Sequence, residues 1–330
     1  KLFIIYIMKI VNYVLVFIAV TAIGMLYDRY SKKFYPDEEL DKYNLVRKYL
    51  LNESDSLDGK PFMWIHTEHK INARDWLSFN SRNSKRLNQP YKDLCVESAV
   101  KQCGDSFKIC LIDDSSFEKL IPNWAICIDS LADPIKSRVR KLALTKLLHT
   151  YGGMLIPNST IVIKDLKSLY DDKINGTKMF TGELQNKTDS NRISRFGPSM
   201  KVLGCVKGCE KMKDLSEHLE ILISKDNTDQ PTFEGNCDRY LRKLMNEGKC
   251  NIICGKGLGT KNKNNEVILI DHLLEESSLN LCMCSLYCII LPSEDILSRT
   301  KYQWFARLNH KQVMEANTQA SKFLIISHGK

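Results

Sequence analysis

The sequence predicts an α/β protein with a mostly parallel sheet, flanking helices, and one membrane-spanning helix ahead of them. From about residue 61 onward, short apolar runs of strand length alternate with longer segments of helical periodicity. A glycine pair, Gly152-Gly153, ends the most regular helical segment just before another apolar run. Near the start of the chain, the 18 residues from Ile10 to Tyr27 carry no charge.

The uncharged segment is long enough to cross a hydrocarbon core of about 30 Å as a helix. No small-x-small cleavage site follows it, which favours an uncleaved anchor over a signal peptide, with Met8 as a candidate start. The flanking cations are Lys1 and Lys9 before the span, and Arg29, Lys32, Lys33, Lys42 and Arg47 after it. This asymmetry predicts that the C-terminal part faces the cytosol. We therefore expect an anchor over 1–28, a juxtamembrane linker over 29–60 and a globular domain over 61–330.

Composition narrows the function classes. The chain has 330 residues, of which 43% are apolar and 26% charged, with a formal net charge of +9. These values exclude a disordered tail, a collagen-like fibre and a multi-span membrane protein. Lys and Arg are spread along the chain without a recognisable module, so we expect no nucleic-acid partner. A solvated lysine-rich surface explains the basic excess, although attraction to an acidic membrane face is left open.

The twelve cysteines favour buried free thiols in a reducing compartment. Several lie inside apolar runs, and a chain of this length does not need a disulfide framework. The C-x3-C spacings of Cys205/Cys209 and Cys250/Cys254 differ from the C-x2-C pairs of zinc sites. Structural zinc and disulfides are the minor alternatives.

The expected elements follow from apolar periodicity and from helix start and stop residues. Strands are expected over 62–66, 107–112, 154–156, 160–163, 178–182, 252–254, 267–270 and 288–291. Helices are expected over 91–101, 116–120 and 134–151. Asp113 and Asp114 directly follow the second strand, and His66 ends the first.

This order resembles that of the GT-A-type glycosyltransferases of the capsular-polysaccharide and mannosyltransferase kind, the DXD sugar-transferase family. It also resembles divergent members encoded by large DNA viruses of protists and algae. The family pattern A-D-x-x-R-x-x-x-L-x-x-x-G-G-x-Y-x-D-x-D compares with residues 140–159, RKLALTKLLHTYGGMLIPNS. The resemblance covers roughly residues 61 to 307 and implies a GT-A-like, Rossmann-like fold.

The residues that carry the family's chemistry are replaced in this chain. In the family, the helix Asp and Arg help to hold the nucleotide donor, and the D-x-D carboxylates bind a divalent metal that neutralises the leaving diphosphate. Aligned on Gly152-Gly153, these positions hold Lys141 and Leu144 on the helix and Pro157, Asn158 and Ser159 after it. The resemblance therefore implies a degenerate donor site, with no metal and no cofactor expected.

Four other residues are candidates for residual nucleotide or sugar contacts: His66, Asp113, Asp114 and Arg140. The two aspartates could bind a metal or a ribose, or cap the short helix that follows. On a strand, His66 and Glu68 face one way and His69 the other, which argues against joint metal ligation. Arg140 and Lys141 lie about 100° apart on a helix, so both cannot point into one site.

The sequence thus favours a membrane-anchored, catalytically inactive glycosyltransferase-like protein with a structural or interaction role. The viral resemblance suggests a minor capsid or membrane-to-capsid linking protein at the internal membrane of a virion, with the bilayer and capsid proteins as partners. The alternative is an active nucleotide-sugar glycosyltransferase. It would use Mn²⁺ or Mg²⁺, or dispense with metal by using Arg140 and Lys141 on the diphosphate. A third hypothesis is a lectin-like glycan binder.

Overall fold

The computed structural model describes residues 49–52, 59–68, 89–185, 196–225 and 230–329. The predicted anchor from Ile10 to Tyr27 and most of the predicted linker lie outside these residues. Within the described part of the chain, no helix is both long enough and apolar enough to cross a membrane.

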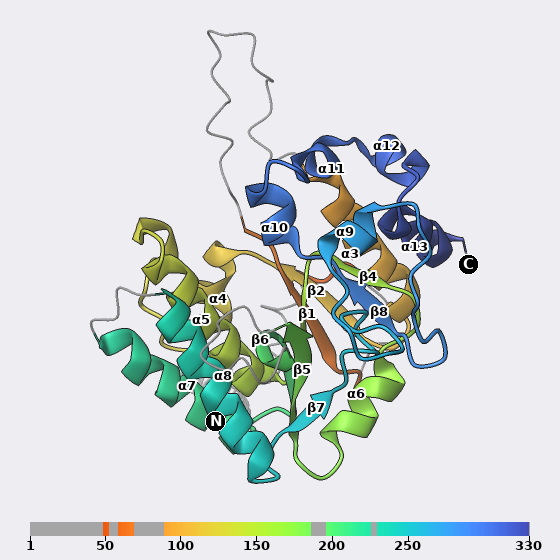
Figure 1. The fold of residues 1–330 in the computed structure, drawn as a ribbon. Helices are drawn as coiled ribbons and strands as arrows, with labels where there is room; N and C mark the ends of the chain where they lie inside the picture. Colours follow the sequence, from red (N-terminus) through yellow and green to blue (C-terminus); the bar gives the residue numbers. More distant parts are fainter. Residues whose placement is uncertain (1–48, 53–58, 69–88, 186–195, 226–229, 330) are drawn as a thin grey trace, which may run out of the picture. The chain divides into compact units, whose positions relative to one another are not determined.

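A six-stranded sheet with the order β2-β1-β3-β6-β5-β7 forms the centre of the fold (Figure 1). Its strands are β1 (Phe62–His66), β2 (Lys108–Ile112), β3 (Gly153–Pro157), β5 (Met179–Gln185), β6 (Phe196–Cys205) and β7 (Asn251–Ile253). β1 pairs in parallel with β2 and β3, and β7 pairs in parallel with β5. Because β6 is antiparallel to both of its neighbours, it alone among these six strands runs in the opposite direction. The prediction of a mostly parallel sheet is confirmed.

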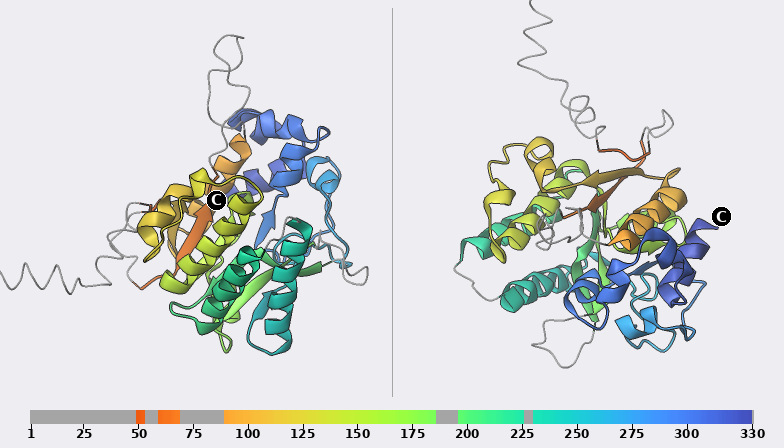
Figure 2. Two further views of the ribbon diagram at one scale, coloured as in Figure 1. Left: turned by 90° about the vertical axis from the view of Figure 1, so that its left-hand side faces the viewer. Right: turned by 90° about the horizontal axis from the view of Figure 1, so that it is seen from above.

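Helices cover both faces of this sheet, as in a Rossmann-like fold (Figures 1 and 2). One side carries α4 (Phe117–Leu120), α5 (Ile135–Tyr151), α7 (Glu210–Ser224) and α8 (Gln230–Asn246). The other side carries α3 (Pro90–Cys103), α9 (Ile270–Leu274), α10 (Ser293–Ser298), α11 (Gln303–Arg307), α12 (His310–Glu315) and α13 (Gln319–His328). A short antiparallel sheet of β4 (Thr160–Val162) and β8 (Cys288–Ile290) and the helix α6 (Lys167–Ile174) complete these elements.

The alternation of side chains along β1 explains how the sheet holds both layers. Met63 and Ile65 are buried in one hydrophobic core together with Ala99 of α3. Trp64 faces the opposite side, where its ring lies 5.6 Å from that of Tyr151 of α5. Successive strand residues point to opposite faces, so one five-residue strand anchors helices on both sides. The end of β1 is therefore held rigidly between the two layers.

The three predicted helices and most predicted strands are confirmed, one predicted strand does not form, and β6 and several helices, α6, α7 and α8 among them, were not expected. The strand predicted over 267–270 does not form: Val267 makes only an isolated bridge with Lys261, and Ile270 already begins α9. The longest strand of the sheet, β6, was not expected, because Gly197, Pro198 and Gly204 are typical of turns. A side chain at Gly204 would meet the ring of Phe180, with the nearest atom 2.1 Å from its Cβ, so this glycine makes room for the ring inside the sheet.

A short segment within the predicted linker pairs with the outer edge of β2. Leu50 forms an antiparallel bridge with Cys110, and the Leu51 amide donates a hydrogen bond of 2.8 Å to the carbonyl of Ile109. The side-chain oxygen of Asn52 accepts a hydrogen bond of 2.9 Å from the amide of Ile109. These bonds cover backbone groups of β2 that would otherwise form an open sheet edge.

Candidate functional site

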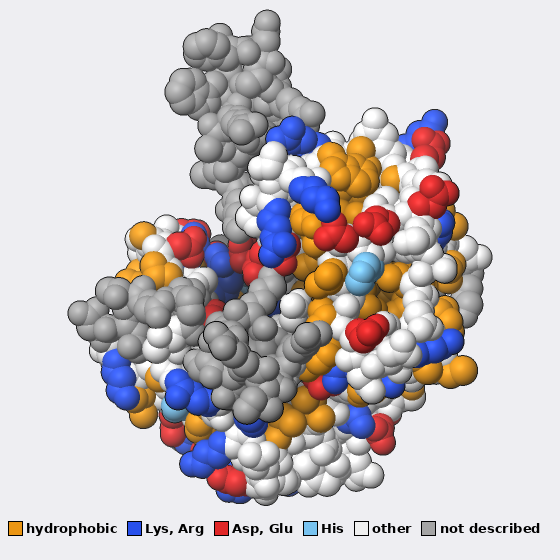
Figure 3. All heavy atoms as spheres, in the orientation of Figure 1, with side chains coloured by type: hydrophobic (Ala, Val, Ile, Leu, Met, Phe, Trp, Pro, Cys, Tyr) orange, Lys and Arg blue, Asp and Glu red, His pale blue; other side chains and the backbone are white. Residues whose placement is uncertain are grey.

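Three of the predicted side chains meet at the edge of the sheet where its parallel strands end. His66 is the last residue of β1, and Asp114 lies two residues beyond the end of β2. Arg140 comes from the first half of α5, which begins at this edge and leads back to the start of β3. Ligand sites of open α/β sheets gather at this edge. On the side of the molecule that Figure 3 shows, acidic and basic side chains meet in a recess between the surfaces over α4 and α10.

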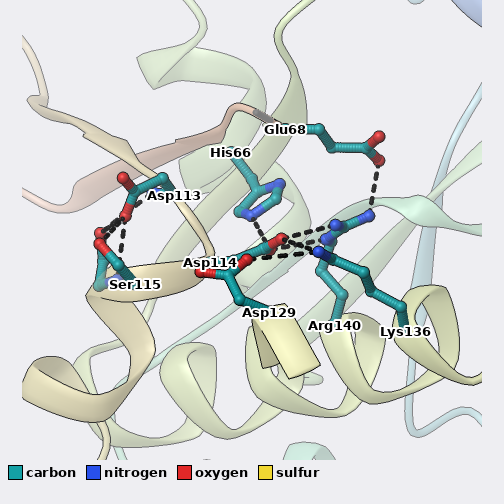
Figure 4. Close-up of polar contacts among 9 residues, drawn as sticks. His66, Glu68, Asp113, Asp114, Ser115, Asp129, Lys136 and Arg140 are labelled. Carbon is teal, nitrogen blue, oxygen red and sulfur yellow. Dashed lines mark hydrogen bonds and ion pairs between the residues drawn. The ribbon is translucent and has the colours of Figure 1, made fainter. Parts of the chain in front are cut away.

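Asp114 lies at the centre of an ion-pair cluster (Figure 4). The members of this cluster are His66, Glu68, Asp114, Asp129, Lys136 and Arg140. Arg140 donates from Nε to Oδ1 at 2.7 Å and from Nη2 to Oδ2 at 2.6 Å, which is a bidentate guanidinium–carboxylate pair. The Nε2 atom of His66 lies 3.0 Å from Oδ1, and the Nζ atom of Lys136 lies 3.9 Å from Oδ2. One carboxylate thus holds together side chains from β1 and α5.

The charge state of Asp114 determines how His66 is hydrogen-bonded to it. Burial would raise the pKa of its carboxyl, but the hydrogen bonds from Arg140 and His66, with their charges, outweigh burial and hold this pKa well below its usual range. Asp114 is therefore ionised near neutral pH, and an ionised carboxylate only accepts hydrogen bonds. It follows that Nε2 of His66 carries a hydrogen and donates it to Asp114. The His66 ring is further fixed by stacking on Phe117 at 5.5 Å.

A second carboxylate, that of Glu68, also contacts Arg140. The Nη1 atom of Arg140 lies 2.9 Å from Oε1 of Glu68, and Lys136 lies 3.3 Å from Asp129. Three carboxylates surround Arg140 and Lys136, and even a charged His66 would only balance them, so the cluster carries no net positive charge. A diphosphate is attracted by the opposite arrangement, an excess of cations. The cluster is a neutralised network, and it is poorly suited to receive a second anion.

Asp113, the neighbour of Asp114, has a different role. Its Oδ1 accepts hydrogen bonds from the Ser116 amide at 3.0 Å, the Ser116 hydroxyl at 2.6 Å and the Ser115 hydroxyl at 2.8 Å. The Ser116 hydroxyl in turn accepts from the Asp113 amide at 3.0 Å, which closes a capping box at the start of the helical turn. Asp113 therefore caps the short helix, which is one of the alternatives that the sequence leaves open, whereas Asp114 belongs to the ion-pair cluster.

Gly152 and Gly153 are required by close backbone approaches. Their φ angles are 73° and 100°, a region that side chains rarely tolerate. A Cβ on Gly152 would lie 2.6 Å from the amide nitrogen of Lys207, and one on Gly153 would lie 2.2 Å from the carbonyl oxygen of Phe62. The indole of Trp64 donates to the Gly152 carbonyl at 2.9 Å. The glycine pair lies at the start of β3, at the edge opposite the cluster, and lets helix and strand meet.

The positions that match the family's metal ligands do not fit a divalent cation. Pro157 ends β3 and has no side-chain donor, and Asn158 provides only a neutral amide in the following turn. Ser159 is buried, and its hydroxyl donates to the carbonyl of Leu291 at 2.8 Å. Hard cations require anionic oxygen ligands. Among the residues that the structure describes, no group of three or more His, Cys, Asp or Glu side chains is placed to hold a metal ion.

We expect Ser159→Ala to lower the free energy of unfolding by about 1 kcal/mol, because the buried carbonyl of Leu291 would lose the Ser159 hydroxyl and keep only the Ser293 amide as a donor. Ser115→Ala is the matched control, since the Ser115 hydroxyl bond is exposed, and a loss below about 0.5 kcal/mol is expected there. Urea denaturation of the two variants gives the comparison. Equal losses would mean that the Ser159 bond is not structural.

Of the family's two helix positions, Lys141 is directed to α8, and Leu144 lies one turn after Arg140 on α5. Lys141 forms an ion pair with Glu234 of α8, and Leu144 is partly buried on α5. Arg140 and Lys141 therefore diverge, as their helical spacing predicts. The Lys141–Glu234 pair lies near Asp238, one turn further along α8. Burial, and then the charge of Glu234, raises the pKa of Asp238 to about 6, although Lys141 and Arg242 oppose the shift.

This raised pKa predicts a pH dependence of stability. The folded state binds the Asp238 proton more tightly than the unfolded chain, so ionisation costs stability above pH 6, and stability rises as pH falls from about 6 towards 4. We expect Asp238→Asn to raise the unfolding free energy at pH 8 by about 1–2 kcal/mol and to change it little near pH 4. The exposed Asp105→Asn is the control. A variant less stable than wild type at pH 8 would contradict the assignment.

Several members of these networks are not predicted by the sequence. Strand alternation places Glu68 on the same side as His66 without indicating an ion pair, and Lys136 precedes Arg140 by one helical turn. This spacing was the available clue to Lys136. Glu234 and Asp238 carry no comparable clue, because the pair of Lys141 and Glu234 spans 93 residues of sequence. His69 lies outside the described residues.

Comparisons with known proteins add little to this picture. No protein-family model matches the chain, and no curated protein shows significant sequence similarity to it. Among solved structures, one described as "PaToxG Glycosyltransferase" is similar with a TM-score of 0.33 and 9% sequence identity, over 68% of this chain and 83% of that chain. A likeness at this level carries no argument about function.

Proposed function

We propose that this chain is a GT-A-like protein that has lost the metal-dependent donor site and serves as a structural and interaction component. The proposal rests first on the sequence resemblance. The strand with His66, the strand before Asp114, the helix with Arg140 and the Gly152-Gly153 start of β3 lie in adjacent positions of one sheet and its covering helix. This adjacency supports reading the four segments as one family pattern.

The observation that carries the loss of the donor site is the turn after β3. The two positions where the family has carboxylates hold Pro157, without a donor, and Ser159, whose hydroxyl is engaged by Leu291. Replacing Ser159 by an acid would place a carboxylate against a carbonyl oxygen, so the missing site cannot be restored there by one substitution. The turn leads directly into the pairing of β4 with β8. Beside that pairing, the Leu291 amide donates to the Ser159 carbonyl at 2.9 Å.

The metal-independent alternative is less well supported. It requires Arg140 and Lys141 to neutralise the leaving diphosphate. The guanidinium of Arg140 already serves Asp114 and Glu68, and Lys141 is paired with Glu234. Freeing either cation for a substrate would break an ion pair with a partly buried carboxylate, which costs stability.

A turnover assay tests the proposal against both enzymatic alternatives. The full chain is incubated with UDP- and GDP-sugars, with and without Mn²⁺, and release of the nucleoside diphosphate is followed. We expect the rate to equal the buffer blank in every case. Release that depends on Mn²⁺ would contradict the lost metal site. Release without metal that disappears in Arg140→Ala and persists in the control Lys167→Ala would establish metal-independent transfer instead.

The membrane and assembly role is proposed from the sequence. The span from Ile10 to Tyr27, the cations after it and the abundance of thiols favour an anchored protein with a cytosol-facing domain. The viral resemblance favours a minor capsid or membrane-to-capsid linking component. Quantitative mass spectrometry of purified particles tests this role, with a copy number proportional to that of the major capsid protein as the expected result. Absence from purified particles would contradict it.

A further inference from the structure

A recess of about 350 Å³ opens at the edge of the sheet opposite the ion-pair cluster. It lies where β1 and β3 begin and where the antiparallel β6 ends. Gly153 of β3 pairs with Cys205 of β6 on one side and approaches the backbone of Phe62 of β1 on the other. The recess is therefore separate from the ion-pair cluster and from the turn after β3.

Two lysines flank this recess on segments that are far apart in the sequence. Lys60 lies two residues before Phe62, and Lys207 lies two residues after Cys205. Neighbouring strands are about 4.8 Å apart, so Phe62 and Cys205, with β3 between them, are separated by about 10 Å. The residues at the start of β3, Gly152-Gly153, add only backbone to the lining. This glycine pair leaves no side chain between the two segments that carry the lysines.

The recess has an excess of positive charge. Among the described residues that line it, three are lysines and none is acidic. The third lysine, Lys167, is balanced by Asp171, whose two carboxylate oxygens lie 2.5 and 2.6 Å from its Nζ atom. The ammonium of Lys60 donates to a neutral group, the carbonyl of Asp105, so this bond leaves its charge in place. An excess of cations attracts anions, and it is the arrangement that the ion-pair cluster lacks.

Aromatic rings supply the apolar part of the lining. They belong to Phe62, Tyr151 and Tyr170. The hydroxyl of Tyr151 donates to the Leu120 carbonyl at 2.8 Å, and that of Tyr170 donates to the Cys205 carbonyl at 3.3 Å. Because both hydroxyls are engaged by the protein, the tyrosines offer ring surface to a ligand. The recess thus combines cations with apolar surface, which is the mixed lining typical of small-molecule sites.

We propose that this recess binds a short dicarboxylate, with one carboxylate at Lys60, the other at Lys207 and the hydrocarbon chain against the rings. Two ammonium groups on separate segments suit a ligand with two separated charges, whereas a phosphate ester carries both charges at one end. The ring surface between the lysines suits a hydrocarbon chain, which inorganic phosphate lacks. A volume of about 350 Å³ is at the lower end for small-molecule sites and favours a ligand smaller than a nucleotide.

Succinate is the probe, and the full chain is titrated with it by calorimetry in about 0.15 M salt, where screening weakens contacts with other exposed lysines. We expect saturable binding of one succinate per chain and no binding of UDP. Inorganic phosphate should bind about tenfold more weakly than succinate, because it has no methylene groups to bury against the rings. Phosphate or UDP binding as tightly as succinate would overturn the proposal.

Three lysine variants assign the contacts. Lys60→Ala and Lys207→Ala should each weaken succinate binding about tenfold, because each removes one charged contact. The matched control is Lys213→Ala, which removes the same charge from the exposed surface of α7 and should change the affinity by less than about twofold. Equal losses in all three variants, or a loss confined to one of the two recess lysines, would overturn the proposal.

The wild-type chain gives a second measurement, which decides the proposal even where a variant fails to fold. The chain is treated with an N-hydroxysuccinimide ester of acetic acid, with and without succinate, and the acetylated lysines are identified by mass spectrometry. We expect succinate to slow the acetylation of Lys60 and Lys207 and to leave that of Lys213 unchanged. No saturable binding in the titration, or equal protection of Lys213, would overturn the proposal.

Discussion

Replacing Arg140 by alanine is expected to lower the free energy of unfolding at pH 7 by about 3–5 kcal/mol. The side chains of Arg140 and Asp114 are only 11% and 9% exposed, so the substitution leaves the Asp114 carboxylate buried with His66 as its main remaining donor. The substitution removes the bidentate bonds at 2.7 and 2.6 Å to Asp114 and the ion pair with Glu68 at 2.9 Å. Urea denaturation followed by circular dichroism gives the measurement.

The exposed pair of Lys167 and Asp171 is the matched control for Arg140. Their side chains are 34% and 56% exposed, so Lys167→Ala should cost less than about 1 kcal/mol. Adding Asp114→Asn to Arg140→Ala should recover part of the loss, because it removes the uncompensated charge. Equal costs for Arg140→Ala and Lys167→Ala would show that the cluster is not a buried network.

Gly153→Ala is expected to destabilise the chain by about 4 kcal/mol, through backbone strain and an unrelieved contact together. Its φ is 100°, and the added Cβ would lie 2.2 Å from the carbonyl oxygen of Phe62. That oxygen belongs to β1, which is paired on both sides and cannot shift without disturbing β2 and β3. Equilibrium denaturation, or the soluble yield if the variant does not accumulate, reports the effect.

A substitution at Gly176 distinguishes backbone strain from the steric contact. Its φ is 84°, similar to that of Gly153, but nothing lies within 4 Å of a Cβ placed on it. Gly176→Ala should therefore cost only the strain of the backbone, about 1–2 kcal/mol. If Gly153→Ala cost no more than Gly176→Ala, the close approach of β1 and β3 would not explain the glycine pair.

Local patterns account for the elements that were predicted correctly. The helix over 134–151 has a regular apolar period and a glycine stop, and both lie within one short stretch of sequence. The strand β6 was missed because what makes it a strand is its pairing with β3 and β5, which compensates for Gly197, Pro198 and Gly204. Val267 and Ile270 lie three residues apart in one apolar stretch, but Val267 forms an isolated bridge with Lys261 and Ile270 begins α9.

The candidate site, like the fold, could be predicted where local sequence patterns place its residues and not where packing between elements does. His66, Asp114 and Arg140 could be selected because each lies at a strand end or on the following helix, where parallel sheets place their ligands. The sequence could not tell Asp113 from Asp114, because a difference of one residue in a helical turn decides which carboxylate caps and which meets Arg140. The pairing of Lys141 with Glu234 depends on how α5 and α8 pack, which no local pattern encodes.

Calorimetric titration of the full chain with UDP and GDP, with and without Mn²⁺, tests the loss of the donor site most directly. We predict no heat of binding at millimolar nucleotide in a chain that circular dichroism shows to be folded. Binding that requires Mn²⁺ would contradict the account, because it would mean that a working metal site exists despite Pro157 and Ser159. Binding without metal that Arg140→Ala abolishes would contradict it as well, because the cluster would then receive an anion.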